Sequence, residues 1–269
     1  MMKRSLSLIA FMTIYVISIG QVNTLKIADS ISKEGKKLYK SEIASWYGTD
    51  IFIDRFKNEA SNIGGYFSYS DKSNETCLFF SKGDNPQVLG TVNFDSTNNL
   101  EKVIVDGTKR KFSEHENDIY LIRKAALDEI EKDTSFFKTY NNTNLNLIPF
   151  VEGEEKRVYV LTGTSRANTI IIGNDYLLNF DKDNILISKK KLHANILTLK
   201  YAEEGKVNKE GSVHTHLPET GAYMTATDIC TFMLYEKIAG WKQQLVISEK
   251  YMSIWNCETD RLIIVPTGR

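Results

Sequence analysis

Residues 64–94 read GGYFSYSDKSNETCLFFSKGDNPQVLGTVNF. Short apolar or aromatic runs in this stretch are separated by polar, turn-forming clusters at residues 71–74 and 82–86. Runs of this length between turn residues are typical of antiparallel β-strands. A further apolar run at residues 103–105 continues the pattern, so we expect several strands here.

Helical segments flank this region. Apolar residues recur at helical spacing over residues 25–46 and again over residues 113–133. The second segment opens with Ser113 followed three residues later by Glu116, the arrangement of a capping box. We therefore expect a helix on each side of the first group of strands.

The rest of the chain is again rich in strands. Predicted strands cover residues 147–151, 157–162, 168–180, 184–199, 213–216, 244–247, 251–255 and 261–265, and a helix covers residues 225–239. The turn at residues 181–183 predicts that the third and fourth of these form a hairpin. The expected class is α+β, with antiparallel sheets and few helices. We place a domain boundary near residues 108–113, which gives an N-terminal α+β region of unknown role at 21–112 and a second domain at 113–269.

The first twenty residues form the pattern of a signal peptide. Lys3 and Arg4 precede an uncharged run at residues 5–19, and Ser18 and Gly20 suit the −3 and −1 positions of a cleavage site. The mature chain would begin near Gln21. The alternative is an uncleaved membrane anchor, although a spanning helix needs about 20 apolar residues. The sequence thus predicts export to the periplasm or the extracellular space, with no membrane association after cleavage.

The charge and cysteine content limit the binding partners and disulfides that the sequence predicts. Lys and Arg together number 34, as do Asp and Glu, so nothing favours nucleic acid or an anionic membrane as a partner. The chain has three cysteines, Cys77, Cys230 and Cys257, and this small odd number does not form a disulfide framework. The sequence does not decide whether any two of them pair.

Two of the four histidines form a His-x-His sequence, His214-Thr215-His216. On a strand, residues i and i+2 point to the same side, so both imidazoles can reach one ion. Asp228 follows twelve residues later, in the first turn of the predicted helix, where its carboxylate can turn back toward the strand end. Two His and one Asp can form an open catalytic zinc site in which water takes the fourth position. The predicted cofactor is therefore Zn²⁺.

Each half of this pattern is also common where no metal is bound. His-x-His on a strand occurs by chance, and Thr225-x-x-Asp228 is a frequent helix start in which Thr is the cap. The combination and the order of the two halves are what favour a metal site.

In that combination the chain resembles the JAB/JAMM (MPN-type) zinc peptidase superfamily, whose signature is His-x-His followed by Ser-x-x-Asp at a helix start. The resemblance covers residues 113–265, where the order of predicted helices and strands also agrees. It implies a JAB-like C-terminal domain in which His214, His216 and Asp228 hold Zn²⁺ and Thr225, replacing the family's Ser, steadies the oxyanion.

The sequence departs from the family pattern at three further points. The family usually has a Pro directly after His-x-His, whereas Pro218 stands one position later here. Eight residues rather than the usual seven separate His216 from Thr225. The family's catalytic Glu belongs on the strand predicted at 157–162, which carries none, and Glu155 is the nearest candidate for the general base.

The sequence leaves three functions open. The first is a zinc-dependent hydrolase of peptide or isopeptide bonds, with a peptide or protein substrate. The second is a non-catalytic exported binding or envelope protein whose metal site has degenerated. The third is a hydrolase of other amides, such as those of cell-wall peptides. The oligomeric state is not predicted.

Overall fold

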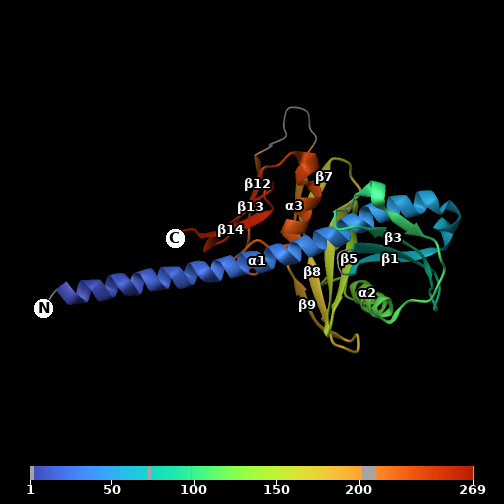
Figure 1. The fold of residues 1–269 in the computed structure, drawn as a ribbon, viewed down its shortest axis with the longest axis horizontal. Helices are drawn as coiled ribbons and strands as arrows, with labels where there is room; N and C mark the ends of the chain where they lie inside the picture. The colour runs from blue at the N-terminus through green and yellow to red at the C-terminus, as the bar shows by residue number, and fades with distance from the viewer. Residues whose placement is uncertain (1–2, 72–73, 98, 202–209, 269) are drawn as a thin grey trace. The chain divides into compact units, whose positions relative to one another are not determined.

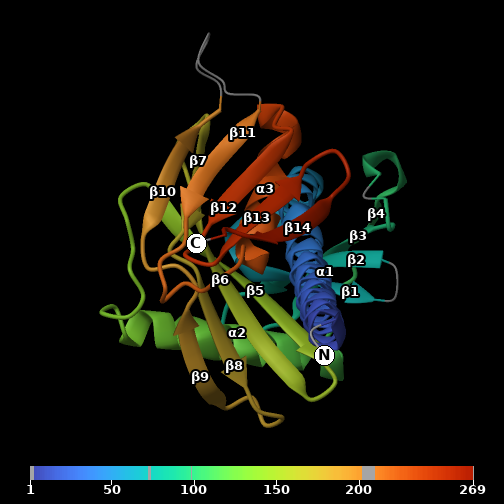
Figure 2. The same ribbon diagram turned by 90° about the vertical axis from the view of Figure 1, so that its left-hand side faces the viewer.

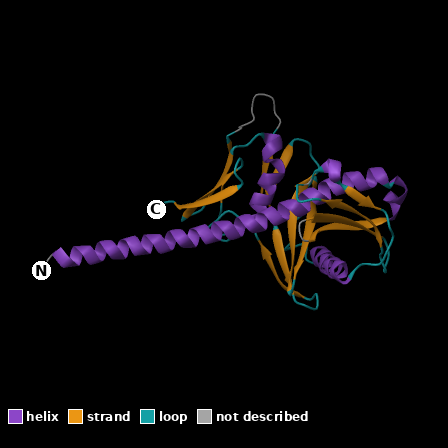
Figure 3. Cartoon of the chain, in the orientation of Figure 1, coloured by secondary structure: helices purple, strands orange, loops and turns teal. Residues whose placement is uncertain are grey.

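The computed structural model describes residues 3–71, 74–97, 99–201 and 210–268, with side chains from residue 23 onward. Figure 1 labels the elements, and Figure 3 distinguishes the few helices from the more numerous strands. The helices are α1 (Lys3–Arg55), α2 (Glu114–Lys132) and α3 (Ala226–Ala239), with 3-10 turns η1 (Lys57–Asn62) and η2 (Leu100–Lys102). The predicted α+β class, with few helices and mainly antiparallel sheets, is confirmed.

Contacts divide the chain into two compact units. Unit 1 comprises Met1–Lys36 and Lys206–Arg269, and unit 2 comprises Lys37–Gly205. The helix α1 contributes residues to both units. In α1 the helix extends beyond the predicted 25–46 in both directions.

Unit 2 contains two four-stranded antiparallel sheets and a two-stranded pair. The first sheet has the order β1 (Ile63–Asp71), β2 (Asn74–Ser81), β3 (Val88–Phe94) and β4 (Ile104–Asp106). The second has the order β5 (Thr143–Glu152), β6 (Glu155–Thr164), β8 (Tyr176–Phe180) and β9 (Leu186–Lys191). The separate pair joins β7 (Thr169–Gly173) to β10 (Ile196–Lys200).

The hairpin predicted over 168–199 is divided between two sheets. Its inner part pairs β8 with β9, whereas its outer part pairs β7 with β10. The division falls at Gly173 and Asn174, which both have positive φ. A Cβ on Gly173 would lie 2.3 Å from the carbonyl oxygen of Asn195, so only glycine fits this bend.

The helix α2 has apolar residues facing in two directions. Ile119 packs with Phe67 and Leu78 of the first sheet, whereas Ile122 packs with Val158 of the second. Figure 2 shows α2 crossing the strands of the second sheet, where it packs on β5 and β6. Core packing thus joins residues on both sides of the boundary expected near 108–113 and divides the chain elsewhere.

Unit 1 contains a mixed sheet and α3. The strand order is β11 (Gly211–Thr215), β12 (Gln243–Ile247), β13 (Tyr251–Asn256) and β14 (Arg261–Pro266). The β11–β12 pair is parallel, while the other two pairs are antiparallel. Parallel neighbours need a crossover connection, and α3 lies in the chain between them. Trp255 of β13 is fully buried, and its indole N–H donates to Glu236 Oε2 on α3 at 3.1 Å.

Among the described residues, no helix has a stretch long and apolar enough to cross a membrane. The signal-peptide prediction concerns residues 1–20, whose side chains lie outside the described part of the chain, and it stays a prediction. No disulfide joins any two of Cys77, Cys230 and Cys257, and the first two are buried.

Candidate metal centre

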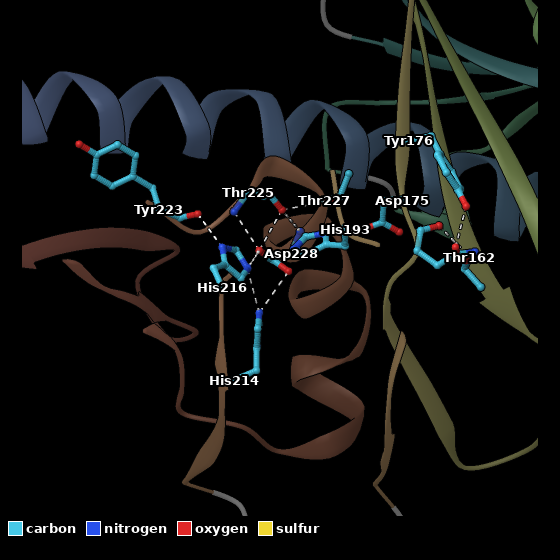
Figure 4. Close-up of polar contacts among 11 residues, drawn as sticks. Thr162, Asp175, Tyr176, His193, His214, His216, Tyr223, Thr225, Thr227 and Asp228 are labelled. Carbon is cyan, nitrogen blue, oxygen red and sulfur yellow. Dashed lines mark hydrogen bonds and ion pairs between the residues drawn. The ribbon is translucent and has the colours of Figure 1, made fainter. Parts of the chain in front are cut away.

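The parallel pairing of β11 and β12 determines where the histidines lie. His214 is in register with Val246, and the His216 amide donates to the carbonyl of Ile247 at 2.9 Å. Both histidines therefore lie at the carboxyl end of β11, where the chain leaves the sheet toward α3. The start of the helix and the two imidazoles come together at the same end of the strand (Figure 4).

The first turn of α3 holds Asp228 in a fixed position. Thr225 is the N-cap, with extended backbone, and its Oγ1 accepts a hydrogen bond from the Asp228 amide at 3.1 Å. In return Asp228 Oδ2 accepts from the Thr225 amide and from the Thr225 hydroxyl, both at 2.8 Å. This is a complete capping box with Asp in place of the usual Glu. The carboxylate is orientated by two donors before any ligand binds.

The same hydrogen bonds bear on the role predicted for Thr225. A hydroxyl has a single proton to donate. In this structure the hydroxyl of Thr225 directs that proton to Asp228 Oδ2. Thr225 therefore acts as a positioning residue for Asp228, and its predicted role at an oxyanion stays a prediction.

His216 presents Nε2 to the cluster. Its Nδ1 lies 2.9 Å from the carbonyl oxygen of Tyr223, and a carbonyl can only accept, so Nδ1 carries the hydrogen. In the neutral imidazole the lone pair is then on Nε2. Metal-bound histidines are orientated in this way by a second hydrogen bond. The His216 side chain is only 1% exposed, which excludes bulk water from the ring.

His214, two residues earlier in the chain, also directs its Nε2 toward the cluster. Its Nε2 lies 3.2 Å from His216 Nε2 and 3.6 Å from Asp228 Oδ1. Its Nδ1 is buried and has no hydrogen-bond partner among the described residues. The ring also lies beside Phe232 of α3, with 6.2 Å between the ring centres. His214 is thus held by packing rather than by a second hydrogen bond.

The three side chains form a triangle of ligand atoms. The edges are 3.2 Å between the two Nε2 atoms, 3.3 Å from His216 to Asp228 Oδ2 and 3.6 Å from His214 to Asp228 Oδ1. Ligands of one tetrahedral ion at bond lengths of about 2.0–2.1 Å lie about 3.3–3.4 Å apart. The Asp228 side chain is 0% exposed, and a buried carboxylate needs a compensating charge. His214, His216 and Asp228 therefore form a buried cluster that could hold a metal ion.

Glu155, the predicted general base, belongs to unit 2. It is the first residue of β6, its side chain is 82% exposed, and its carboxylate lies 3.3 Å from the Arg157 guanidinium. The three candidate ligands belong to unit 1. A catalytic role for Glu155 stays a prediction that depends on the family resemblance.

Sequence reasoning missed the contacts that hold the loop between β11 and α3. The Met224 amide donates to Ser253 Oγ at 3.1 Å, and the Tyr223 carbonyl meets His216. Backbone groups make these contacts, so residue types along the loop gave no signal of them. A second histidine environment was also missed. In unit 2, the buried His193 has its Nδ1 3.1 Å from Asp175 Oδ2.

The candidate metal cluster therefore rests on its geometry alone. Comparison of the chain with protein-family models, with curated proteins and with solved structures finds no match.

Proposed function

We propose that this protein is an exported zinc-dependent hydrolase of peptide or isopeptide bonds, built on a JAB/JAMM-like C-terminal domain. The observation that supports the proposal is the triangle formed by His214 Nε2, His216 Nε2 and Asp228, whose edges of 3.2–3.6 Å suit three ligands of one tetrahedral ion. Two imidazoles and a carboxylate are the donor types that catalytic zinc accepts.

Each residue has a defined part in the proposal. His214, His216 and Asp228 would hold Zn²⁺, which would supply Lewis acidity and activate a water molecule for attack on the substrate. The Tyr223 carbonyl fixes the His216 tautomer, and Thr225 fixes the Asp228 rotamer. A carboxylate takes the proton of the water, and Glu155 is the residue that the resemblance suggests for this step.

A non-catalytic zinc-binding protein is the second candidate. Two observations favour it: Glu155 is exposed and paired with Arg157, and the Thr225 proton is already donated to Asp228. A binding protein needs the same three ligands but neither a base nor an oxyanion donor. Both candidates predict bound metal, and hydrolysis separates them.

Metal analysis of the purified mature protein is the first test. We expect about one zinc ion per chain after reconstitution, as for other sites with three protein ligands. His216→Ala should lose the ion, whereas the matched control His115→Ala, which removes an exposed histidine of unit 2, should keep it. Circular dichroism must show that both variants are folded. Zinc-free wild-type protein after reconstitution would refute both zinc-dependent candidates and leave the exported binding or envelope protein with a degenerate metal site.

The hydrolase is tested by the cleavage of a peptide library followed by mass spectrometry. Cleavage should be lost with a chelator and restored by zinc. Zinc-loaded protein that cleaves no peptide, isopeptide or cell-wall amide would leave the binding protein as the function.

Export is tested by sequencing the amino terminus of the protein from its native host. A start near Gln21 would support cleavage, whereas an intact start in the membrane fraction would support the anchor.

A further inference from the structure

A small cavity lies directly against His216. It has a volume of about 210 Å³, and its lining comes from the end of β11, the loop that follows, and the turn between β12 and β13. All of these segments belong to unit 1. His216 thus lines the cavity and also contributes its Nε2 to the triangle.

The walls of the cavity are held by hydrogen bonds. Ser248 Oγ lies 2.7 Å from the carbonyl oxygen of Ala222, which joins the turn to the loop. The Tyr251 amide donates to the same Oγ at 3.1 Å. Thr267 fixes the other side of the turn, since its amide donates to the Lys250 carbonyl and its hydroxyl to the Glu249 carbonyl. A cavity that is formed in advance costs little to order when a ligand enters.

The loop wall depends on one glycine. Gly221 has φ +117°, which L side chains rarely adopt, and a Cβ there would meet nothing within 4 Å. The glycine is thus required by the backbone turn and not by a lack of space. The neighbouring wall residues, Pro218 and Ala222, are small and apolar.

The size of the cavity limits its occupant. Pockets for drug-sized ligands begin at about 300 Å³. The cavity therefore suits a single amino-acid residue and not a longer segment of chain.

Charge around the cavity favours an anionic occupant. Glu249 and Lys250 are exposed lining residues, and neither side chain forms an ion pair within the part of the chain that the structure describes. A divalent ion and Lys250 together outweigh the two carboxylates of Asp228 and Glu249, so the loaded site is net positive. The terminal carboxylate of a peptide is an anionic group of the required size.

We propose that this cavity binds the C-terminal residue of a peptide, with the terminal carboxylate facing Lys250. Cleavage of that peptide rests on the proposed function, whereas binding in the cavity does not. In the reaction, the water oxygen joins the carbonyl carbon of the last peptide bond and the C–N bond breaks. The shortened peptide leaves as a carboxylic acid, and the nitrogen of the released amino acid takes a proton from the water.

The test compares two small probes on the full mature chain by ligand-observed NMR titration. N-acetylglycine carries the terminal carboxylate, and N-acetylglycinamide is its neutral match. The acid should bind more tightly than the amide. Lys250→Ala should lower the affinity for the acid by about two- to fivefold, the range for an exposed ion pair. The affinity for the amide should not change.

Two variants control for general charge effects. Lys237→Ala removes an exposed lysine of α3 and should leave both affinities unchanged. Glu249→Gln removes the competing carboxylate, so the affinity for the acid should rise or stay unchanged. The inference would be overturned if the two probes bound equally or if neither bound. It would also be overturned if Lys250→Ala left the affinity for the acid unchanged.

The titrations are run on both zinc-loaded and zinc-free protein, so that failures can be separated. Protein that holds no zinc refutes the proposed function, yet the effect of Lys250→Ala on the acid still decides the inference. Zinc-loaded protein whose probe binding is independent of Lys250 refutes the inference alone.

Discussion

The Nε2 atoms of His214 and His216 lie 3.2 Å apart. Because the Tyr223 carbonyl holds the hydrogen of His216 on Nδ1, the lone pair of its neutral ring points at the other nitrogen. Two lone pairs at this distance repel unless a proton or a cation lies between them. Either a hydrogen on His214 Nε2 or a cation can lie between these two atoms, and Asp228 supplies the negative charge that a cation would need.

Asp228→Asn should lower zinc affinity. The substitution keeps the shape of the side chain but removes the charge and replaces one oxygen by a donor nitrogen that repels a cation. Loss of a supporting hydrogen bond alone costs a metal site about 10–100-fold, so loss of a ligand should cost at least that much. A competition titration against a chelating dye gives the affinity. Glu258→Gln, an exposed acid of the same unit, should match wild type. Equal affinities for wild type and Asp228→Asn would exclude this carboxylate as a ligand.

Substitution of Thr225 tests its role as the N-cap of α3. Thr225→Ala removes the N-cap of α3 and should lower the free energy of unfolding by about 0.5–2 kcal/mol, whereas Thr225→Ser keeps the hydroxyl and should cost less. Thermal unfolding measures both. A Thr225→Ala variant as stable as wild type would show that the capping box contributes little to the fold.

Local rules made the ligand set predictable. The side-chain period of a strand placed His214 and His216 on one side, and the helix-start pattern placed Asp228 in the first turn of α3. Both rules act over a few residues and depend on residue type. The same is true of the capping box at Ser113 and Glu116, which the structure contains as predicted.

Features that depend on distant or backbone contacts were not predictable. The parallel pairing of β11 with β12 follows from the path of the chain through α3, which residue types do not encode. The Tyr223 carbonyl that orientates His216 would be the same group on any residue. The division of the predicted 168–199 hairpin depends on the close approach of Gly173 to Asn195, whereas a glycine within a strand can equally mark a bulge or a ligand contact.

The packing of α1 on α3 within unit 1 gives a prediction of defined sign. A Cβ on Gly35 would lie 2.7 Å from Cβ and Cγ2 of Ile229 and 3.0 Å from the carbonyl oxygen of Ala226. In an exposed helix, Gly→Ala stabilises by about 0.5–1 kcal/mol, but overpacking costs about 1–3 kcal/mol. The second effect should win because neither a Cβ atom nor a backbone carbonyl can swing away.

We therefore expect Gly35→Ala to lower the melting temperature and, because Ala226 adjoins Thr225, to weaken zinc binding as well. Lys33→Ala on the same helix is the control and should be close to neutral. A Gly35→Ala variant with raised stability would show that α1 can move away from α3 at little cost.

Glu116 should make the stability of unit 2 depend on acid pH. The residue is buried on α2, which acts to raise its pKa, but hydrogen bonds from Arg110, the Ser113 amide and Tyr69 outweigh burial and lower the pKa to about 2. A folded-state pKa below the unfolded value near 4.5 stabilises the protein fully above pH 4.5, and this contribution is lost as pH falls toward 2. Its size is about 1–3 kcal/mol.

Glu116→Gln removes the titrating group and isolates this effect. The variant should be less stable than wild type at pH 7, since the amide cannot accept the bidentate Arg110 guanidinium as the carboxylate does. The two proteins should become more alike as pH falls from 4.5 to 2. Urea unfolding at pH 7, 4.5 and 3 gives both curves, and Glu114→Gln at the exposed neighbouring acid is the matched control. A constant difference between wild type and Glu116→Gln at all three pH values would mean that the carboxylate does not carry the acid dependence, because a titrating Glu116 must lose its advantage once it is protonated.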